Sequence, residues 1–213
     1  MIRQNARASE NAIRRRAFNV PEKASLNARR LTAYLVEPFE TDIDKMRVIA
    51  YWIASHIAYD GYKYNAGQVN KRNWSYHYDI FRSKTGICTD FALLFQEMSG
   101  YAGIRGVKIV TGYVGKPTFI KRKRPPANAA GHAWNSVKIK GKNYYIDTTW
   151  MAPQKIIPKR KGNFNSWSHK MEVKRRSRMD TQVSADIRTF FFLFTPEDEA
   201  KNFGEVHYET AEY

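Results

Sequence analysis

The chain has 213 residues, with 36 Lys and Arg against 20 Asp and Glu and a formal net charge of +16. This length fits one ordinary domain, and 43% hydrophobic and 14% aromatic residues argue against disorder. A single cysteine excludes an intramolecular disulfide framework, a cysteine-based zinc site and an iron–sulfur cluster.

No membrane span is expected, because no stretch approaches about 18 apolar residues. The basic N-terminus lacks the apolar core of an uncleaved signal peptide. A signal removed earlier would leave no trace, so the compartment stays open between the cytoplasm and export.

The positive charge is concentrated in residues 1–30, 121–124 and 155–178. Such clusters are typical of a solvated basic surface, and peripheral contact with an anionic surface or an acidic polymer is the alternative. Nothing matches a helix-turn-helix, zinc-finger or RNP pattern, so specific nucleic-acid binding is not expected. Residues 1–24 are expected to form a mobile arm or a short helix against the domain.

Two helices are predicted next along the chain. The first begins after Thr41, a suitable N-cap, has apolar residues at positions 46, 49, 50, 53 and 57, and stops by Gly61. Residues 60–80 favour an ordered surface loop. The second helix begins near Cys88, with apolar residues at positions 91, 94, 95 and 98, and Gly100 and Gly103 close it.

Strands are predicted at residues 106–114, 132–139, 143–150 and 189–194. The last is followed by Thr195-Pro196-Glu197, a suitable cap and first turn for another helix. Helices first and contiguous antiparallel strands later indicate the α+β class. The long stretch 151–188 is expected to border a cleft.

Cys88 is a candidate nucleophile. It lies in Gly86-Ile87-Cys88-Thr89-Asp90-Phe91-Ala92, at the start of the second predicted helix. Unpaired backbone N–H groups and the helix dipole stabilise a thiolate there, and the same groups can hold an oxyanion. The alternative is a buried structural cysteine, the usual state of a free thiol.

His132 and Asp147 are predicted to lie on the same face of a hairpin. Asp147 interrupts an apolar strand, where a carboxylate needs a partner. If Lys140-Gly141 forms a two-residue turn, His132 faces Thr149 and Asp147 faces Trp134. The two residues are then diagonal neighbours with Cα atoms about 7–8 Å apart, within reach of a hydrogen bond. A slip of one residue would place them on opposite faces.

Cys88, His132 and Asp147 together fit a catalytic triad. In such a triad a thiolate attacks an amide carbonyl, the histidine moves the proton, and the aspartate orients the imidazole. The other histidines, at positions 56, 77, 169 and 207, show no metal-binding spacing and are expected to be surface or structural residues.

The segments that carry these three residues resemble the core motifs of the transglutaminase-like superfamily. They are Gly-Ile-Cys-Thr-Asp-Phe-Ala at 86–92, Gly-His-Ala-Trp-Asn at 131–135 and Tyr-Ile-Asp-Thr-Thr-Trp at 145–150. Residues 52–60 and 191–197 are similar to the helix before the core and the strand after it in bacterial and kyphoscoliosis-peptidase-like members. The similarity covers about residues 40–200.

The resemblance implies a papain-like α+β core, with Cys88 at a helix N-terminus packed on an antiparallel sheet that carries His132 and Asp147. A single catalytic domain at residues 31–213 would follow a basic N-terminal arm at residues 1–30. No cofactor and no metal is expected. The side chain that completes the oxyanion site stays open among Trp74, Tyr76 and His77.

The expected function is that of a cysteine-dependent enzyme that acts on amide bonds of a protein or peptide through a thioester. A peptidase or amidase is favoured over a cross-linking enzyme, because water is always available and no amine site is visible. A protein transglutaminase or a glutamine deamidase is the alternative within the same chemistry. A non-catalytic module that binds an acidic polymer or protein is the alternative outside it. The oligomeric state is not predicted.

Overall fold

The computed structural model describes residues 8–60, 80–81, 83–115, 131–153, 187–203 and 206–212. Its helices are α1 (Glu10–Phe18), α2 (Ala28–Val36), α3 (Asp42–His56), α6 (Cys88–Tyr101), α7 (Thr148–Met151) and α9 (Pro196–Phe203), with 3₁₀ turns η1 (Glu22–Leu26) and η4 (Thr189–Phe191). Its strands are β1 (Ala58–Tyr59), β2 (Thr85–Gly86), β3 (Val107–Gly115), β4 (Gly131–Ile139), β5 (Lys142–Ile146), β6 (Phe192–Phe194) and β7 (Val206–Glu212).

Several sequence predictions lie outside these described residues. They concern the loop that holds Trp74, Tyr76 and His77, the basic stretches 121–124 and 155–178, and most of the segment expected to border a cleft.

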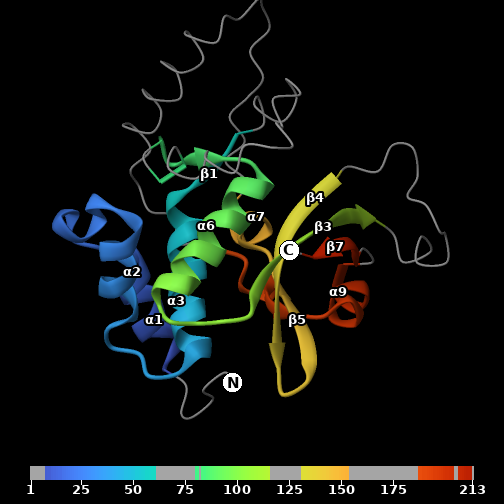
Figure 1. Cartoon of the computed structure of the whole chain (residues 1–213), viewed down its shortest axis with the longest axis horizontal. Helices are drawn as coiled ribbons and strands as arrows, with labels where there is room; N and C mark the ends of the chain where they lie inside the picture. Colours follow the sequence, from blue (N-terminus) through green and yellow to red (C-terminus); the bar gives the residue numbers. More distant parts are fainter. Residues whose placement is uncertain are drawn as a thin grey trace, which may run out of the picture.

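The described residues form a helical layer beside an antiparallel sheet, which confirms the α+β class. Figure 1 shows α1, α2 and α3 on one side, the sheet on the other, and α6 between them. The strand order is β6-β5-β4-β3-β7, and every neighbouring pair is antiparallel. β1 and β2 form a separate parallel pair directly before α6.

The two predicted helices are confirmed. Thr41 caps α3, since its Oγ1 accepts a hydrogen bond from the Asp44 N–H at 3.0 Å. α3 is buried on most sides because α1, α2, α6 and α7 all pack against it. α6 begins at Cys88, and Phe91 and Phe95 on its apolar face are fully buried.

The described part of the N-terminal region is a short helix packed against the domain. Ser9 caps α1, and Ile13 and Ala17 on its inner face are fully buried. The Tyr51 hydroxyl of α3 donates a hydrogen bond to the Glu10 carboxylate at 3.0 Å. Because this contact is charge-assisted and partly buried, it ties α1 to the central helix.

The predicted hairpin turn is confirmed. Lys140 and Gly141 both have positive φ angles, 50° and 84°, as a two-residue turn of the I′ type requires. Ile139 pairs with Lys142 and Asn135 with Ile146, which is the expected register.

The strand predicted at 143–150 is too long. β5 ends at Ile146, and residues 148–151 form the helical turn α7. The reason is Asp147, whose Oδ1 accepts a hydrogen bond from the Trp150 N–H at 2.9 Å and so caps this turn. The expected pairing of His132 with Thr149 is therefore absent from the β4–β5 ladder.

The strand predicted at 189–194 is shorter as well. Residues 189–191 form η4, and only 192–194 pair with β5. Phe191 O accepts a hydrogen bond from the Asp147 N–H at 2.9 Å, so this segment is anchored at α7 rather than extended along the sheet. The predicted cap at Thr195 is confirmed, because its Oγ1 accepts a hydrogen bond from the Asp198 N–H.

The sheet is curved, so that β5 and β7 approach each other on one face. The Tyr145 hydroxyl on β5 donates to Glu209 Oε2 on β7 at 3.0 Å, although β4 and β3 lie between these strands. Successive residues of β4 point to opposite faces. Ala133 packs with Cys88 of α6, whereas Trp134 contacts His207 on the other face. Both faces of β4 are therefore covered, which explains why residues 133–137 are all buried.

Candidate active site

Cys88 is the first residue of α6 and is 6% exposed. The segment before it must pack closely, because a Cβ on Gly86 would lie 2.7 Å from Ile80 Cδ1. The Ile87 N–H donates to Asp90 Oδ2 at 2.9 Å, and the first backbone bond of the helix runs from the Phe91 N–H to Ile87 O. The Cys88 thiol thus lies at the positive end of the helix dipole, as the sequence predicted.

His132 and Asp147 are hydrogen-bonded, with Nε2 and Oδ2 2.6 Å apart. The Asp147 side chain is fully buried and that of His132 is 10% exposed. Cys88 lies close enough to His132 to help raise the pKa of this imidazole, so the three candidate residues lie in one array. The predicted proximity of His132 and Asp147 is present, although Asp147 reaches its position at a helix cap rather than within a strand.

The array favours a charged imidazole at His132. Burial lowers the pKa of His132, but the Asp147 carboxylate, and then Cys88, more than offset this and raise it from 6.5 to about 10. Burial likewise opposes ionisation of Asp147, yet His132 and His207 hold the pKa of this carboxyl well below its usual range. An imidazolium beside a thiol at a helix N-terminus is the arrangement that supports a thiolate nucleophile.

His207 is the residue at this site that sequence reasoning missed. Its Nε2 lies 2.9 Å from Asp147 Oδ2, and its Nδ1 lies 2.7 Å from Glu199 Oε1. The sequence interpretation allowed a structural role, but it gave no reason to place this histidine beside Asp147. No motif marks His207, and only the curvature of the sheet brings β7 to the end of β5.

A metal ion does not fit this cluster as it stands. The ligand atoms of His132, Asp147 and His207 lie within 4.8 Å of one another. However, both ring nitrogens of His207 already face carboxylate oxygens at hydrogen-bond distance. A metal needs a neutral imidazole with a free lone pair, so it would have to replace the proton between His207 and Asp147.

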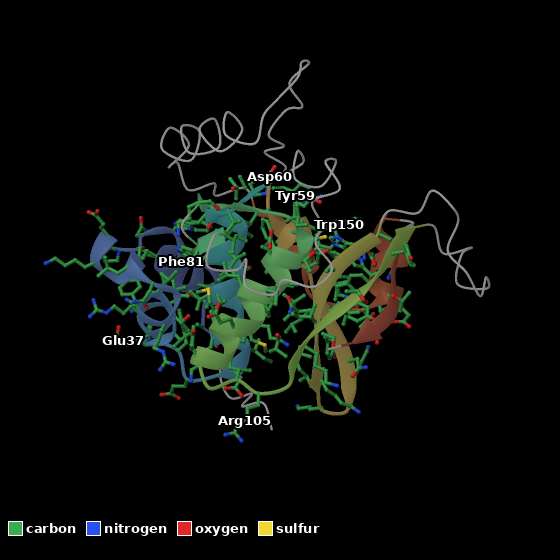
Figure 2. The ribbon with its side chains drawn as sticks, turned by 45° about the horizontal axis from the view of Figure 1, so that its top comes forward. Glu37, Tyr59, Asp60, Phe81, Arg105 and Trp150 are labelled. Carbon is green, nitrogen blue, oxygen red and sulfur yellow. The ribbon has the colours of Figure 1, made fainter. Side chains whose placement is uncertain are left out.

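Aromatic side chains border the array. The Trp150 ring centroid lies 5.9 Å from that of His132, and Tyr59 packs against the apolar cluster that contains Cys88. Figure 2 shows Tyr59, Asp60 and Trp150 near one another at one end of the molecule, away from Glu37 and Arg105. Tyr59 and Trp150 thus lie beside Cys88 and His132, respectively.

The comparisons with known proteins agree with this geometry. The family model of the transglutaminase-like superfamily matches residues 29–152, more than half of the chain. The chain therefore belongs to the transglutaminase-like superfamily, as the three motifs predicted. Cys88, His132 and Asp147 all lie within the matched residues.

Two curated relatives are kyphoscoliosis peptidases. The mouse protein is 32% identical and the human protein 31% identical over 134 residues, which is 63% of this chain. The chain spans about a fifth of the length of these relatives, since the matched part is 19% of each.

Solved structures give more distant matches. A candidate cysteine protease from Cytophaga hutchinsonii has a TM-score of 0.42 and 16% identity, covering 96% of this chain and 55% of that one. A structure described as a TGase has a TM-score of 0.38 and 15% identity, covering 76% of this chain and 37% of that one.

None of the helices in the described part of the chain combines the length and the hydropathy of a membrane span.

Proposed function

We propose that this protein is a cysteine-dependent enzyme that cleaves amide bonds through a thioester, with Cys88 as nucleophile, His132 as general acid and base, and Asp147 as the residue that orients His132. The observation that carries the proposal is the 2.6 Å bond between His132 and Asp147, with Cys88 close enough to the same imidazole to help raise its pKa.

In the first half of the reaction, the Cys88 thiolate attacks the carbonyl carbon of the substrate amide. The oxyanion that forms is stabilised by the Cys88 N–H, which precedes the first intrahelical bond of α6. The C–N bond then breaks, and His132 gives its proton to the departing amine. The product of this step is a thioester between Cys88 and the acyl group.

In the second half, the neutral His132 takes a proton from the group that attacks the thioester. The C–S bond then breaks, which releases the acyl group and restores the Cys88 thiolate beside the protonated His132. Water as the attacking group gives hydrolysis, and a primary amine gives acyl transfer. We favour hydrolysis, because two relatives at 31–32% identity are named peptidases and water needs no binding site of its own. We propose a protein or peptide substrate with acidic character, because the chain carries a net charge of +16.

The same net charge supports a second candidate, a module that binds an acidic polymer or protein without catalysis. This candidate predicts binding that weakens steeply with salt and survives the substitution Cys88→Ala. The enzyme proposal predicts that this substitution abolishes turnover.

The test incubates the full chain and its Cys88→Ala variant with a mixture of glutamine-containing peptides and a primary amine. Mass spectrometry of the peptides distinguishes cleavage, a mass gain of about one unit from deamidation, and amine incorporation. We expect cleavage with the unmodified chain and none with Cys88→Ala. Thr89→Ser, a small change at the next residue, is the matched control and should retain turnover. No product of any kind from the unmodified chain would contradict the proposal.

A further inference from the structure

We propose that His207 is a positioning residue of this site: as an imidazolium it bridges the buried carboxylates of Asp147 and Glu199, keeps Asp147 ionised and holds its Oδ2 toward His132. This inference rests on the proposed function, because it assigns His207 a part in the same reaction. His207 lies in β7, outside the residues matched to the family.

The first observation is the hydrogen bonding of the two carboxylates. Asp147 Oδ2 lies 2.6 Å from His132 Nε2 and 2.9 Å from His207 Nε2. Its Oδ1 accepts from the Trp150 N–H. Both carboxylate oxygens of Glu199 are bonded to His207: Oε1 lies 2.7 Å from His207 Nδ1, and Oε2 accepts from the backbone N–H of His207 at 2.7 Å.

The second observation is the complete burial of this arrangement. The side chains of His207 and Asp147 are 0% exposed, and Glu199 is also fully buried. A buried carboxylate is stable only when it is paired and hydrogen-bonded. Removal of the cation that bridges two such carboxylates would therefore leave an unfavourable pair of negative charges.

These contacts define the protonation state of His207. A neutral imidazole has a proton on one ring nitrogen only, so its other nitrogen would present a lone pair to a carboxylate oxygen. With both nitrogens facing carboxylates, the ring donates at both only as an imidazolium. Burial alone lowers the pKa of His207, but the bonds to Asp147 and Glu199 outweigh it and raise this pKa.

The consequence reaches the nucleophile through Asp147. Two imidazolium groups, His132 and His207, offset the charges of Asp147 and Glu199, so both carboxylates can stay ionised. If His207 loses its charge, protonation of Asp147 becomes easier, and a neutral Asp147 no longer favours the charged form of His132. As the pH falls, Asp147 then takes up its proton at a higher pH, and the pairing of the Cys88 thiolate with a charged His132 is lost there.

The other titratable groups that face His207 do not replace it. Its ring centroid lies 5.4 Å from that of His132 and 6.5 Å from that of Tyr145, whose hydroxyl is bonded to Glu209. Arg188 interacts with Asp147 through its charge. Its pKa shows that it is partly desolvated: burial lowers it, and Asp147 offsets part of this effect.

The first experiment uses the unmodified chain. Nitrogen-15 NMR of the histidine rings reports whether each ring nitrogen carries a proton. We expect both nitrogens of His207 to be protonated at about pH 7.5, a unit above the ordinary histidine pKa. A single protonated nitrogen at that pH would overturn the proposal, whether or not the protein is an enzyme.

The second experiment measures the rate at which iodoacetamide alkylates Cys88 as a function of pH, in the full chain and in variants. Because Cys88 is the single cysteine, the label reports this site alone. Loss of an ion-pair partner raises a carboxyl pKa by about 1–3 units. We therefore expect His207→Gln to move the acid side of the rate profile up by about 1–3 pH units, which lowers the rate about tenfold or more on that side.

A second change, on α9, tests whether His207 acts through its positive charge. Glu199→Gln removes the other buried charge, so we expect the double variant His207→Gln with Glu199→Gln to recover most of the rate lost in His207→Gln. A structural role alone predicts no recovery. Glu197→Gln, the same change at an exposed position of α9, is the matched control and should match the unmodified chain within about twofold.

The outcomes separate this inference from the proposed function. A Cys88 that reacts in the unmodified chain like an ordinary thiol would contradict the proposed function. An activated Cys88 whose pH profile is unchanged in His207→Gln, or a double variant as slow as His207→Gln, would overturn the role of His207 alone. If His207→Gln does not fold, the NMR measurement on the unmodified chain decides the protonation state.

Discussion

His56 and His132 are both largely buried histidines with aromatic neighbours, but their pKa values move in opposite directions. His56 stacks on Trp52 at 4.8 Å between ring centroids, and the Lys84 ammonium lies 4.6 Å from the centroid of the same Trp52 ring. Burial lowers the pKa of His56 to about 4; a hydrogen bond to Trp52 O opposes this shift, and the charge of Lys84 adds to it. His132 is raised to about 10.

The difference between the two regions is a carboxylate. Burial disfavours the imidazolium in both, and both imidazoles have hydrogen-bond partners. Only His132 has an ionised partner, Asp147, at 2.6 Å. Thus one buried histidine is a neutral packing element and the other a charged group suited to proton transfer, although residue type and burial alone would describe them alike.

The largest effect is expected from Asp147→Asn, which would make the surroundings of His132 resemble those of His56. Without the carboxylate, burial dominates and the pKa of His132 falls, so the imidazolium that pairs with Cys88 is lost near neutral pH. Loss of this group is expected to slow amide turnover by about 10³–10⁴-fold, measured as kcat with a peptide substrate. His56→Gln, which leaves this array intact, should not slow turnover; equal losses in the two variants would contradict the comparison.

A smaller effect is expected from His56→Gln on acid stability. In the unfolded chain His56 binds a proton below about 6.5, whereas in the folded chain it does so only below about 4. Folding is therefore destabilised as the pH falls from 6.5 to 4. Gln does not titrate, so the loss of unfolding free energy across this range should be about 2 kcal/mol smaller in the variant.

Urea denaturation at a series of pH values measures this difference. His132 gives the opposite sign, because its raised pKa stabilises the fold below 6.5 and this contribution is lost as the pH rises from 6.5 to about 10. If the unfolding free energies of His56→Gln and of the unmodified chain fall in parallel as the pH is lowered, His56 is not held neutral in the folded chain.

The smallest effect is expected from Lys84→Met. The Lys84 ammonium lies 4.0 Å from the Phe81 ring centroid and 4.6 Å from that of Trp52. After burial, the charge of Lys84 is the smaller of the two causes that lower the pKa of His56. Its removal should raise the pKa of His56 by about 0.5, as observed by proton NMR titration. Met keeps a Cβ at this position of positive φ, so the backbone strain is matched. Lys23→Met, at an exposed site, should leave the pKa of His56 unchanged.

The parts of the fold that were predictable have local causes. The cap at Thr41, the apolar spacing of α3 and α6, and the Lys140-Gly141 turn act over a few residues each. The turn sets the β4–β5 register, which ends one residue before Asp147, and the three short motifs identified the family.

The parts that were not predictable depend on competition between elements or on distant contacts. The apolar run through Trp150 indicated a strand, but the side chain of Asp147 capped a helical turn instead. His207 reaches Asp147 across 60 residues and only because the sheet curves. No period or motif in the sequence reports such a curvature.

The sequence separations around Asp147 also imply an order of assembly. The bond from His132 closes a loop of 15 residues, and the bond from His207 closes one of 60. Two doublings of loop length add about 1.2 kcal/mol of chain entropy, so the His132–Asp147 pair is the less demanding contact to form. The hairpin can thus form the polar pair as a local unit during folding, to which α6 adds the thiol and β7 adds the second imidazole.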